Sequence, residues 1–151
     1  MKLKKYSSHP KSERGQSLTE LAVIVVIMII ILAGVVDLGG VIFQYLAMRD
    51  AAQEGASYAT AFPDSCNEII DRVYASLYNA DPNVVLVNVL IDGEQCVEAS
   101  ASNACAGNEV EVIVRHPNYP ITMPFLGTFI GSQSINLETS VRDSILRPPC
   151  P

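Results

Sequence analysis

An uninterrupted apolar run near the N-terminus constrains this chain more than any other feature. Residues 21–36, LAVIVVIMIIILAGVV, contain no charged or strongly polar side chain. A helix that crosses the hydrocarbon core of a bilayer needs about 20 mostly apolar residues. The run is slightly short of that length and completes it by continuing past Asp37 to Phe43. We therefore predict a transmembrane helix over residues 16–43.

The positive charges of the chain gather in front of this run. All four lysines lie in the first 11 residues, and Arg14 follows them. Because basic flanks of a membrane span stay on the cytoplasmic side, we expect the N-terminus inside and residues 44–151 outside. A soluble domain released by signal peptidase is an alternative, but the apolar core of such a signal is only about 7–15 residues long.

Composition disfavours several classes of function. The net charge is -6, whereas binding to nucleic acid needs a clustered basic surface. Two histidines and no glycine-rich phosphate loop leave little material for an enzyme, and His116 beside Pro117 does not indicate a catalytic triad. We therefore expect no enzyme, no cofactor and no nucleic-acid partner. We also expect no metal site, because the cysteines form no closely spaced pair and His116 is the only histidine beyond the basic leader.

The outer part of the chain has the pattern of an α+β domain. The first helix should continue until Pro63 breaks it, and Ser65 with Glu68 predicts a capping box at the start of a second helix. Strand patterns follow in residues 84–91, 109–115 and 134–142. We predict a pilin-like α+β fold: a long N-terminal helix, a second helix and a small antiparallel sheet of about three or more strands.

A proline-rich, apolar segment, residues 117–130, lies between the last two predicted strands. An exposed apolar loop of this kind often contacts a partner. It can also fold under the sheet, which is the interpretation we favour, although the sequence leaves both open.

Four cysteines fall in the predicted outer part: Cys66, Cys96, Cys105 and Cys150. An even number of cysteines in an oxidising compartment predicts two disulfides, and four cysteines allow three pairings. Cys96 and Cys105 lie in one loop between two strands, so we pair them with each other. Cys66 then pairs with Cys150 and fixes the C-terminal tail to the second helix.

The residues directly before the apolar run carry a recognisable order of features, Arg14-Gly15-Gln16-Ser17-Leu18-Thr19-Glu20. This segment resembles the signals that prepilin peptidase cuts: a basic leader, a glycine, a glutamate at the fifth mature position and an apolar helix. Cleavage after Gly15 would remove residues 1–15 and make Gln16 the first residue and Glu20 the fifth. Glycine also leaves the backbone accessible, since it has no side chain. The resemblance implies prepilin peptidase as a partner.

Two acids bracket the apolar run. Glu20 is costly at the edge of a membrane helix unless it is paired. In a filament the new α-amino group of a neighbouring subunit could pair it, whereas in a single helix the dipole favours an acid in the first turn. Asp37 lies 17 residues later, about 25 Å along a helix. It either marks the outer interface, where water reaches it, or contacts a partner subunit.

A wider resemblance covers residues 14–60. The cleavage motif and apolar run are followed by Asp37-Leu38-Gly39 and by the alanine-rich stretch from Ala51 to Ala59. Together these features are similar to the TadE-like family of minor pilins or pseudopilins of tight-adherence pili, which are related to type IV pili. This chain departs from the family pattern at three positions: Leu21 replaces an aromatic residue, and Gln53 and Ser57 replace basic ones.

The resemblance implies a minor pilin that contributes to pilus assembly or adhesion. Its partners would be other pilin subunits, the assembly platform and membrane lipid, and incorporation into an extracellular pilus would follow. The alternative is an uncleaved, single-pass membrane-anchored binding protein whose outer domain is the working part. The sequence leaves open whether the subunit lies at the tip, in the shaft or in the platform, and it names no ligand.

Overall fold

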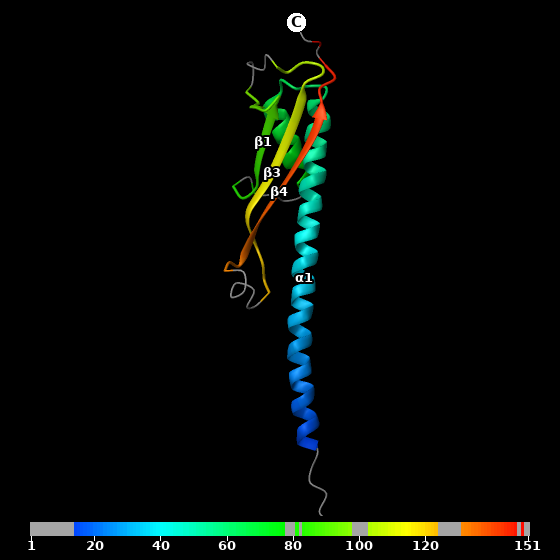
Figure 1. The fold of residues 1–151 in the computed structure, drawn as a ribbon, viewed down its shortest axis with the longest axis vertical. Coiled ribbons are helices and arrows are strands. Elements are labelled where there is room, and N and C mark those ends of the chain that lie inside the picture. Colours follow the sequence, from blue (N-terminus) through cyan, green and yellow to red (C-terminus); the bar gives the residue numbers. More distant parts are fainter. Residues whose placement is uncertain are drawn as a thin grey trace, which may run out of the picture.

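The computed structural model describes residues 14–77, 81, 83–97, 103–123, 131–147 and 149. In chain order its elements are α1 (Arg14–Ala59), α2 (Cys66–Ser76), β1 (Leu86–Ile91), β2 (Glu94–Gln95), β3 (Glu109–Pro120) and β4 (Ser134–Ser144). The N-terminal half of α1 extends far beyond the rest of the molecule, and the other elements gather beside its C-terminal half (Figure 1). The predicted α+β fold is confirmed.

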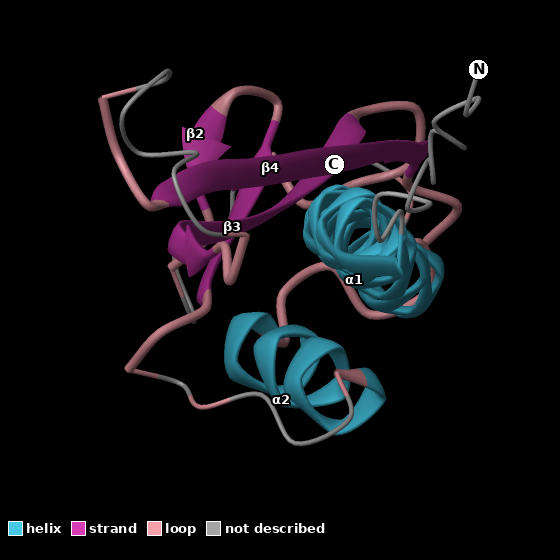
Figure 2. Ribbon diagram, turned by 90° about the horizontal axis from the view of Figure 1, so that it is seen from below, coloured by secondary structure: helices cyan, strands magenta, loops and turns pink. Residues whose placement is uncertain are grey.

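The four strands form one antiparallel sheet in the order β2-β1-β3-β4. Both helices lie on one side of this sheet, with α1 against β3 and β4 (Figure 2). Val110, Val112 and Val114 point to the helices and are fully buried, which confirms the alternation predicted for this strand. The sheet therefore has one apolar face and one face toward solvent.

Charged pairs cross between β3 and β4 on the solvent face. The register places Arg115 opposite Glu138 and Glu111 opposite Arg142. The Arg115 Nε lies 2.9 Å from the Glu138 Oε2, and the Arg142 Nε lies 3.1 Å from the Glu111 Oε1. Opposite charges directly across two strands stabilise a register by a few tenths of a kcal/mol, up to about 1 kcal/mol.

The C-terminal half of α1 is buried through small side chains. Ala51, Ala52, Ala56 and Ala59 have no exposed surface. A Cβ built on Gly55 would lie only 2.4 Å from the Val73 Cγ2, so a glycine is needed where α1 and α2 cross. Small residues on one face let the backbone of α1 approach both the sheet and α2.

The N-terminal half of α1 has the opposite character. Its large apolar side chains are exposed, for example Ile24 at 57%, Ile29 at 60% and Val36 at 71%. By length and composition, α1 is the one helix among the described residues that could cross a membrane. This agrees with a single-pass anchor near the N-terminus.

Two local predictions were wrong. Ser65 stands before α2, but its side chain makes no capping hydrogen bond in the described structure. Pro117 and Pro120 belong to β3, although we expected a loop there. Beyond Arg115, β3 pairs only with β4, and the register shifts between His116 and Tyr119. Prolines are tolerated at such an edge and bulge, because no partner strand needs their missing N–H.

Candidate functional site

The predicted cleavage segment forms the first turns of α1. Gly15, Gln16 and Glu20 are all exposed, and a Cβ built on Gly15 would have no described atom within 4 Å outside its own helix. The Gln16 Nε2 donates a hydrogen bond of 3.2 Å to the Glu20 Oε1. Glu20 therefore faces the residue that would become the first after cleavage. Residues 1–13 of the predicted leader lie outside the described residues.

Asp37 has partners within the chain. It accepts a hydrogen bond of 2.5 Å from the Thr122 hydroxyl and another from the Met123 backbone N–H. Neither interpretation of Asp37 from the sequence included such a contact. No local sequence pattern predicted Thr122 as a partner of Asp37, because 85 residues separate the two. The position of Thr122 depends on how the whole sheet is paired.

The contact to Asp37 comes from the far end of the β3–β4 ribbon, here called the hairpin end and comprising residues 119–123 and 131–134. The ribbon extends beyond β1, so that it runs along α1 toward the N-terminal half (Figure 1). Built Cβ atoms place Gly40 3.3 Å from the Tyr119 hydroxyl and Gly34 3.4 Å from the Met123 Sδ. The hairpin end thus reaches the last residues of the apolar run.

A bulge positions this hairpin end. Asn118 has a positive φ of 60°, and its N–H donates to the Asn136 Oδ1 at 3.1 Å. The His116 and Tyr119 rings meet edge to face, with centroids 5.3 Å apart. Bulges of this kind bend a strand and re-aim its side chains. The predicted segment 117–130 is therefore part strand, while residues 124–130 lie outside the described residues.

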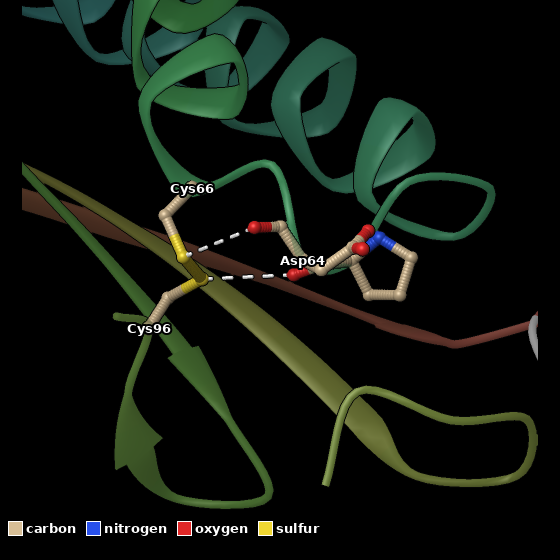
Figure 3. The surroundings of a disulfide bond; sticks show 4 residues. Asp64, Cys66 and Cys96 are labelled. Carbon is tan, nitrogen blue, oxygen red and sulfur yellow. Dashed lines mark hydrogen bonds between the residues drawn. A yellow bond between two sulfur atoms is a disulfide. The ribbon is translucent and has the colours of Figure 1, made fainter. Parts of the chain in front are cut away.

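A disulfide joins Cys66 to Cys96 across a Cα–Cα distance of 5.8 Å (Figure 3). The predicted pairs Cys96–Cys105 and Cys66–Cys150 are therefore wrong. The turn at Asp92-Gly93, both with positive φ, brings β2 back along β1, and β1 packs beside α2. Cys96 thereby reaches the start of α2. Cys105 is also disulfide-bonded, and Cys150 lies outside the described residues.

Polar side chains form a cluster between α1 and α2. The Arg72 guanidinium lies 4.1 Å from the centre of the Tyr58 ring and 3.5 Å from a Glu54 carboxylate oxygen. The Tyr58 hydroxyl donates to Glu68, and this bond raises the pKa of Tyr58. Glu68 therefore accepts a hydrogen bond from Tyr58, and the predicted capping box with Ser65 is not formed. The cluster lines a shallow depression on the surface together with Asp71 and Ala75.

The comparison with protein families concerns α1. Residues 15–57 match the family model described as TadE-like protein. This confirms the predicted family resemblance over that segment, which runs from the predicted cleavage glycine to Ser57 and includes Asp37. Helix α2 and the sheet lie outside it. Neither the curated proteins nor the solved structures yield a match to this chain.

Among the residues that the structure describes, no group of three or more histidine, cysteine, aspartate or glutamate side chains could hold a metal ion. The candidate functional site is a set of surfaces on α1 and beside it. These are the predicted cleavage segment, the exposed apolar half of α1 and the Asp37 contact with the hairpin end.

Proposed function

We propose that this chain is a minor pilin or pseudopilin of a tight-adherence pilus, processed by prepilin peptidase and anchored in the membrane by α1. One observation carries the proposal. The TadE-like match at residues 15–57 coincides with a helix whose first half exposes its large apolar side chains. Exposed apolar surface of this extent is stable only when lipid or other apolar helices cover it.

The start of α1 is suited to cleavage between Gly15 and Gln16. The scissile bond lies in the first turn, where the helix frays most easily because its first N–H groups lack partners within the helix. Gly15 is exposed and has open space around it. The basic leader would hold this bond at the cytoplasmic face, where the peptidase acts.

Glu20 would act after cleavage. In this structure its carboxylate accepts a hydrogen bond from the Gln16 side chain. Removal of residues 1–15 would create a positive α-amino group at Gln16. A neighbouring subunit's amino group could then pair with Glu20 and offset the cost of an acid beside hydrocarbon. The pair would align subunits as they enter a pilus.

The outer domain would supply the contacts that distinguish a minor pilin from a bare membrane helix. Its solvent-facing sheet carries the charged pairs of β3 and β4, and the polar cluster around Arg72 lies on another surface. These surfaces would meet other pilin subunits, the assembly platform or an adhesion ligand.

The intact mass of the chain and the identity of its first residue test this proposal. The full chain is isolated from membranes with and without active prepilin peptidase, and its intact mass and N-terminus are determined. We expect a chain that begins at Gln16 only when the peptidase is active. Gly15→Leu should block cleavage, whereas Gly39→Leu is a matched control because Gly39 also has open space around it.

A chain that keeps Met1 to Gly15 with the active peptidase would contradict the proposal. The uncleaved, membrane-anchored binding protein would then be the better description. An N-terminus beyond residue 34 would instead indicate release by signal peptidase.

A further inference from the structure

The hairpin end meets α1 at the level where the apolar run finishes. Asp37, the first charged residue after that run, receives its two hydrogen bonds from Thr122 and Met123. The Met123 Sδ lies beside Gly34, near the end of the run. Any membrane that surrounds the apolar run must therefore come close to the hairpin end.

Helix length places the membrane boundary at the same level. From Glu20 to Asp37, the two acids that bracket the apolar run, an α-helix rises about 25 Å, at 1.5 Å per residue. The hydrocarbon core of a bilayer is about 30 Å thick. The outer boundary of the hydrocarbon core therefore lies at Asp37 or within about one helical turn beyond it. Backbone polar groups of a strand end cannot lie in hydrocarbon without partners, so the hairpin end lies at the boundary and not below it.

The charge distribution agrees with a lipid neighbour. Residues 116–137 contain no aspartate, glutamate, lysine or arginine, although the chain has 16 acids and 10 bases in all. Charge begins again at Arg115 and Glu138, which face each other further along the ribbon. An acidic surface would be repelled by anionic headgroups, whereas tyrosines such as Tyr119 are favoured at a membrane interface.

We propose that the hairpin end rests on the lipid headgroups of the outer leaflet and gives the outer domain a second membrane contact beside α1. The hydrogen bonds from Thr122 and Met123 to Asp37 hold it against the helix at that depth. Two contacts restrict how the sheet can tilt about the helix. This inference rests on the membrane anchoring in the proposed function but not on cleavage or on assembly into a pilus.

Tryptophan fluorescence tests this contact, because the chain contains no tryptophan. Three single-tryptophan variants of the full chain are placed in phosphatidylcholine vesicles, with and without brominated acyl chains. Ile121→Trp reports on the hairpin end. The backbone N–H of Ile121 donates to the Gln133 carbonyl oxygen, and the substitution leaves this backbone bond in place. Leu146→Trp, at a side chain that is 71% exposed beyond β4, is the matched control. Val26→Trp reports on the anchor.

We expect brominated lipid to quench Ile121→Trp several-fold more than Leu146→Trp and less than Val26→Trp. Equal quenching of Ile121→Trp and Leu146→Trp would overturn the inference. Protection of Ile121→Trp from aqueous acrylamide without quenching by lipid would also overturn it, since a protein neighbour would then cover the hairpin end.

Failure of the anchor is distinguishable from failure of this inference. If lipid does not quench Val26→Trp, the membrane anchor itself is wrong. If lipid quenches Val26→Trp alone, the anchor stands and the hairpin contact is wrong. Should Ile121→Trp disturb the fold, Ser132→Trp places the probe at an exposed position of the hairpin end just before β4, with the same expected result.

Discussion

The two halves of α1 have different chemistry, although they form one continuous helix. Residues 21–36 present mostly large, exposed apolar side chains, including Ile24 and Val36. From Met48 to Ala59, one face of the same helix buries mostly alanine against the sheet and α2. Large exposed side chains suit lipid, which fills any shape, whereas small buried ones allow the close packing of a folded domain.

This difference teaches that helix propensity and apolar composition do not decide where a helix is buried. The more apolar half of α1 contributes little to the core of the outer domain. The core depends instead on where the sheet and α2 can approach the backbone. Substitutions at matched positions in the two halves therefore separate folding from membrane anchoring.

The largest expected effect on folding comes from Met48→Ala. Met48 is fully buried, and its truncation should lower the free energy of unfolding of the outer domain by about 2–5 kcal/mol, through lost burial and the cavity left behind. Met28→Ala is the matched control, because Met28 is 54% exposed in the other half. Denaturant titration in micelles, followed by circular dichroism, measures both. Equal destabilisation by the two substitutions would remove the distinction between the halves.

Removing the disulfide should have a similar effect confined to the outer domain. The bond joins residues 30 positions apart, and a loop of this length is worth about 3–4 kcal/mol through the entropy of the unfolded chain. The double variant Cys66→Ser with Cys96→Ser should unfold earlier in the same titration while its membrane association is unchanged. Peptide mapping of the unreduced parent chain should find Cys66 linked to Cys96, and a Cys96–Cys105 peptide would contradict the structure.

Gly55→Ala should destabilise the crossing of α1 and α2. The added methyl would clash with Val73, which lies on a second helix and has little freedom to move. Overpacking of this kind costs about 1–3 kcal/mol. Gly39→Ala is the control, because open space surrounds Gly39 and alanine is the better helix former. Thermal unfolding should therefore separate the two variants, and a Gly55→Ala chain as stable as the parent would show that the helices lie further apart.

Loss of the Asp37 carboxylate should loosen the hairpin end locally. Asp37→Ala removes both acceptors and should cost about 1 kcal/mol, with faster hydrogen exchange at the Met123 amide. Asp37→Asn keeps one acceptor oxygen and should have an intermediate effect. Asp50→Ala is an exposed control on the same helix. Unchanged exchange at Met123 in Asp37→Ala would show that the hairpin end is held by other contacts.

The smallest expected effect is a pH dependence at Tyr58. Its hydrogen bond to Glu68 raises its pKa above 10.0 in the folded state, so the folded chain holds this proton more tightly than the unfolded chain. The stability from this bond is complete below pH 10 and is lost as the pH rises through the folded pKa. Tyr58→Phe should abolish this part of the slope in alkaline unfolding curves. An unchanged slope would exclude the bond as its cause.

Much of the fold could be predicted from local patterns. The apolar run, the alternation of Val110, Val112 and Val114, and the turn at Asp92-Gly93 each follow from side-chain periodicity or turn chemistry. The disulfide pairing could not be predicted, since it depends on β2 folding back beside the start of α2. Proximity in sequence favoured Cys105 as the partner of Cys96, but the sheet placed Cys66 nearer.

The contact of Asp37 with Thr122 could not be predicted from the sequence either. An acid at the end of an apolar run indicates a membrane interface. It does not indicate which group donates a hydrogen bond to the carboxylate. Thr122 can reach Asp37 because β3 and β4 remain paired beyond the end of β1. This extension of β3 includes Pro117 and Pro120, which we expected in a loop. Long-range register, rather than any local signal, decides this part of the candidate site.

We expect the N-terminal half of α1 to contact lipid while its C-terminal half packs in the outer domain. A map of lipid contact along α1 is the most direct test of this account. The full chain is reconstituted with a phospholipid that carries a photoreactive acyl chain, illuminated, digested and sequenced by mass spectrometry. We predict labels on residues 18–36 and none from Met48 to Ala59. Labels spread evenly along the helix, or absent from residues 18–36, would contradict the account.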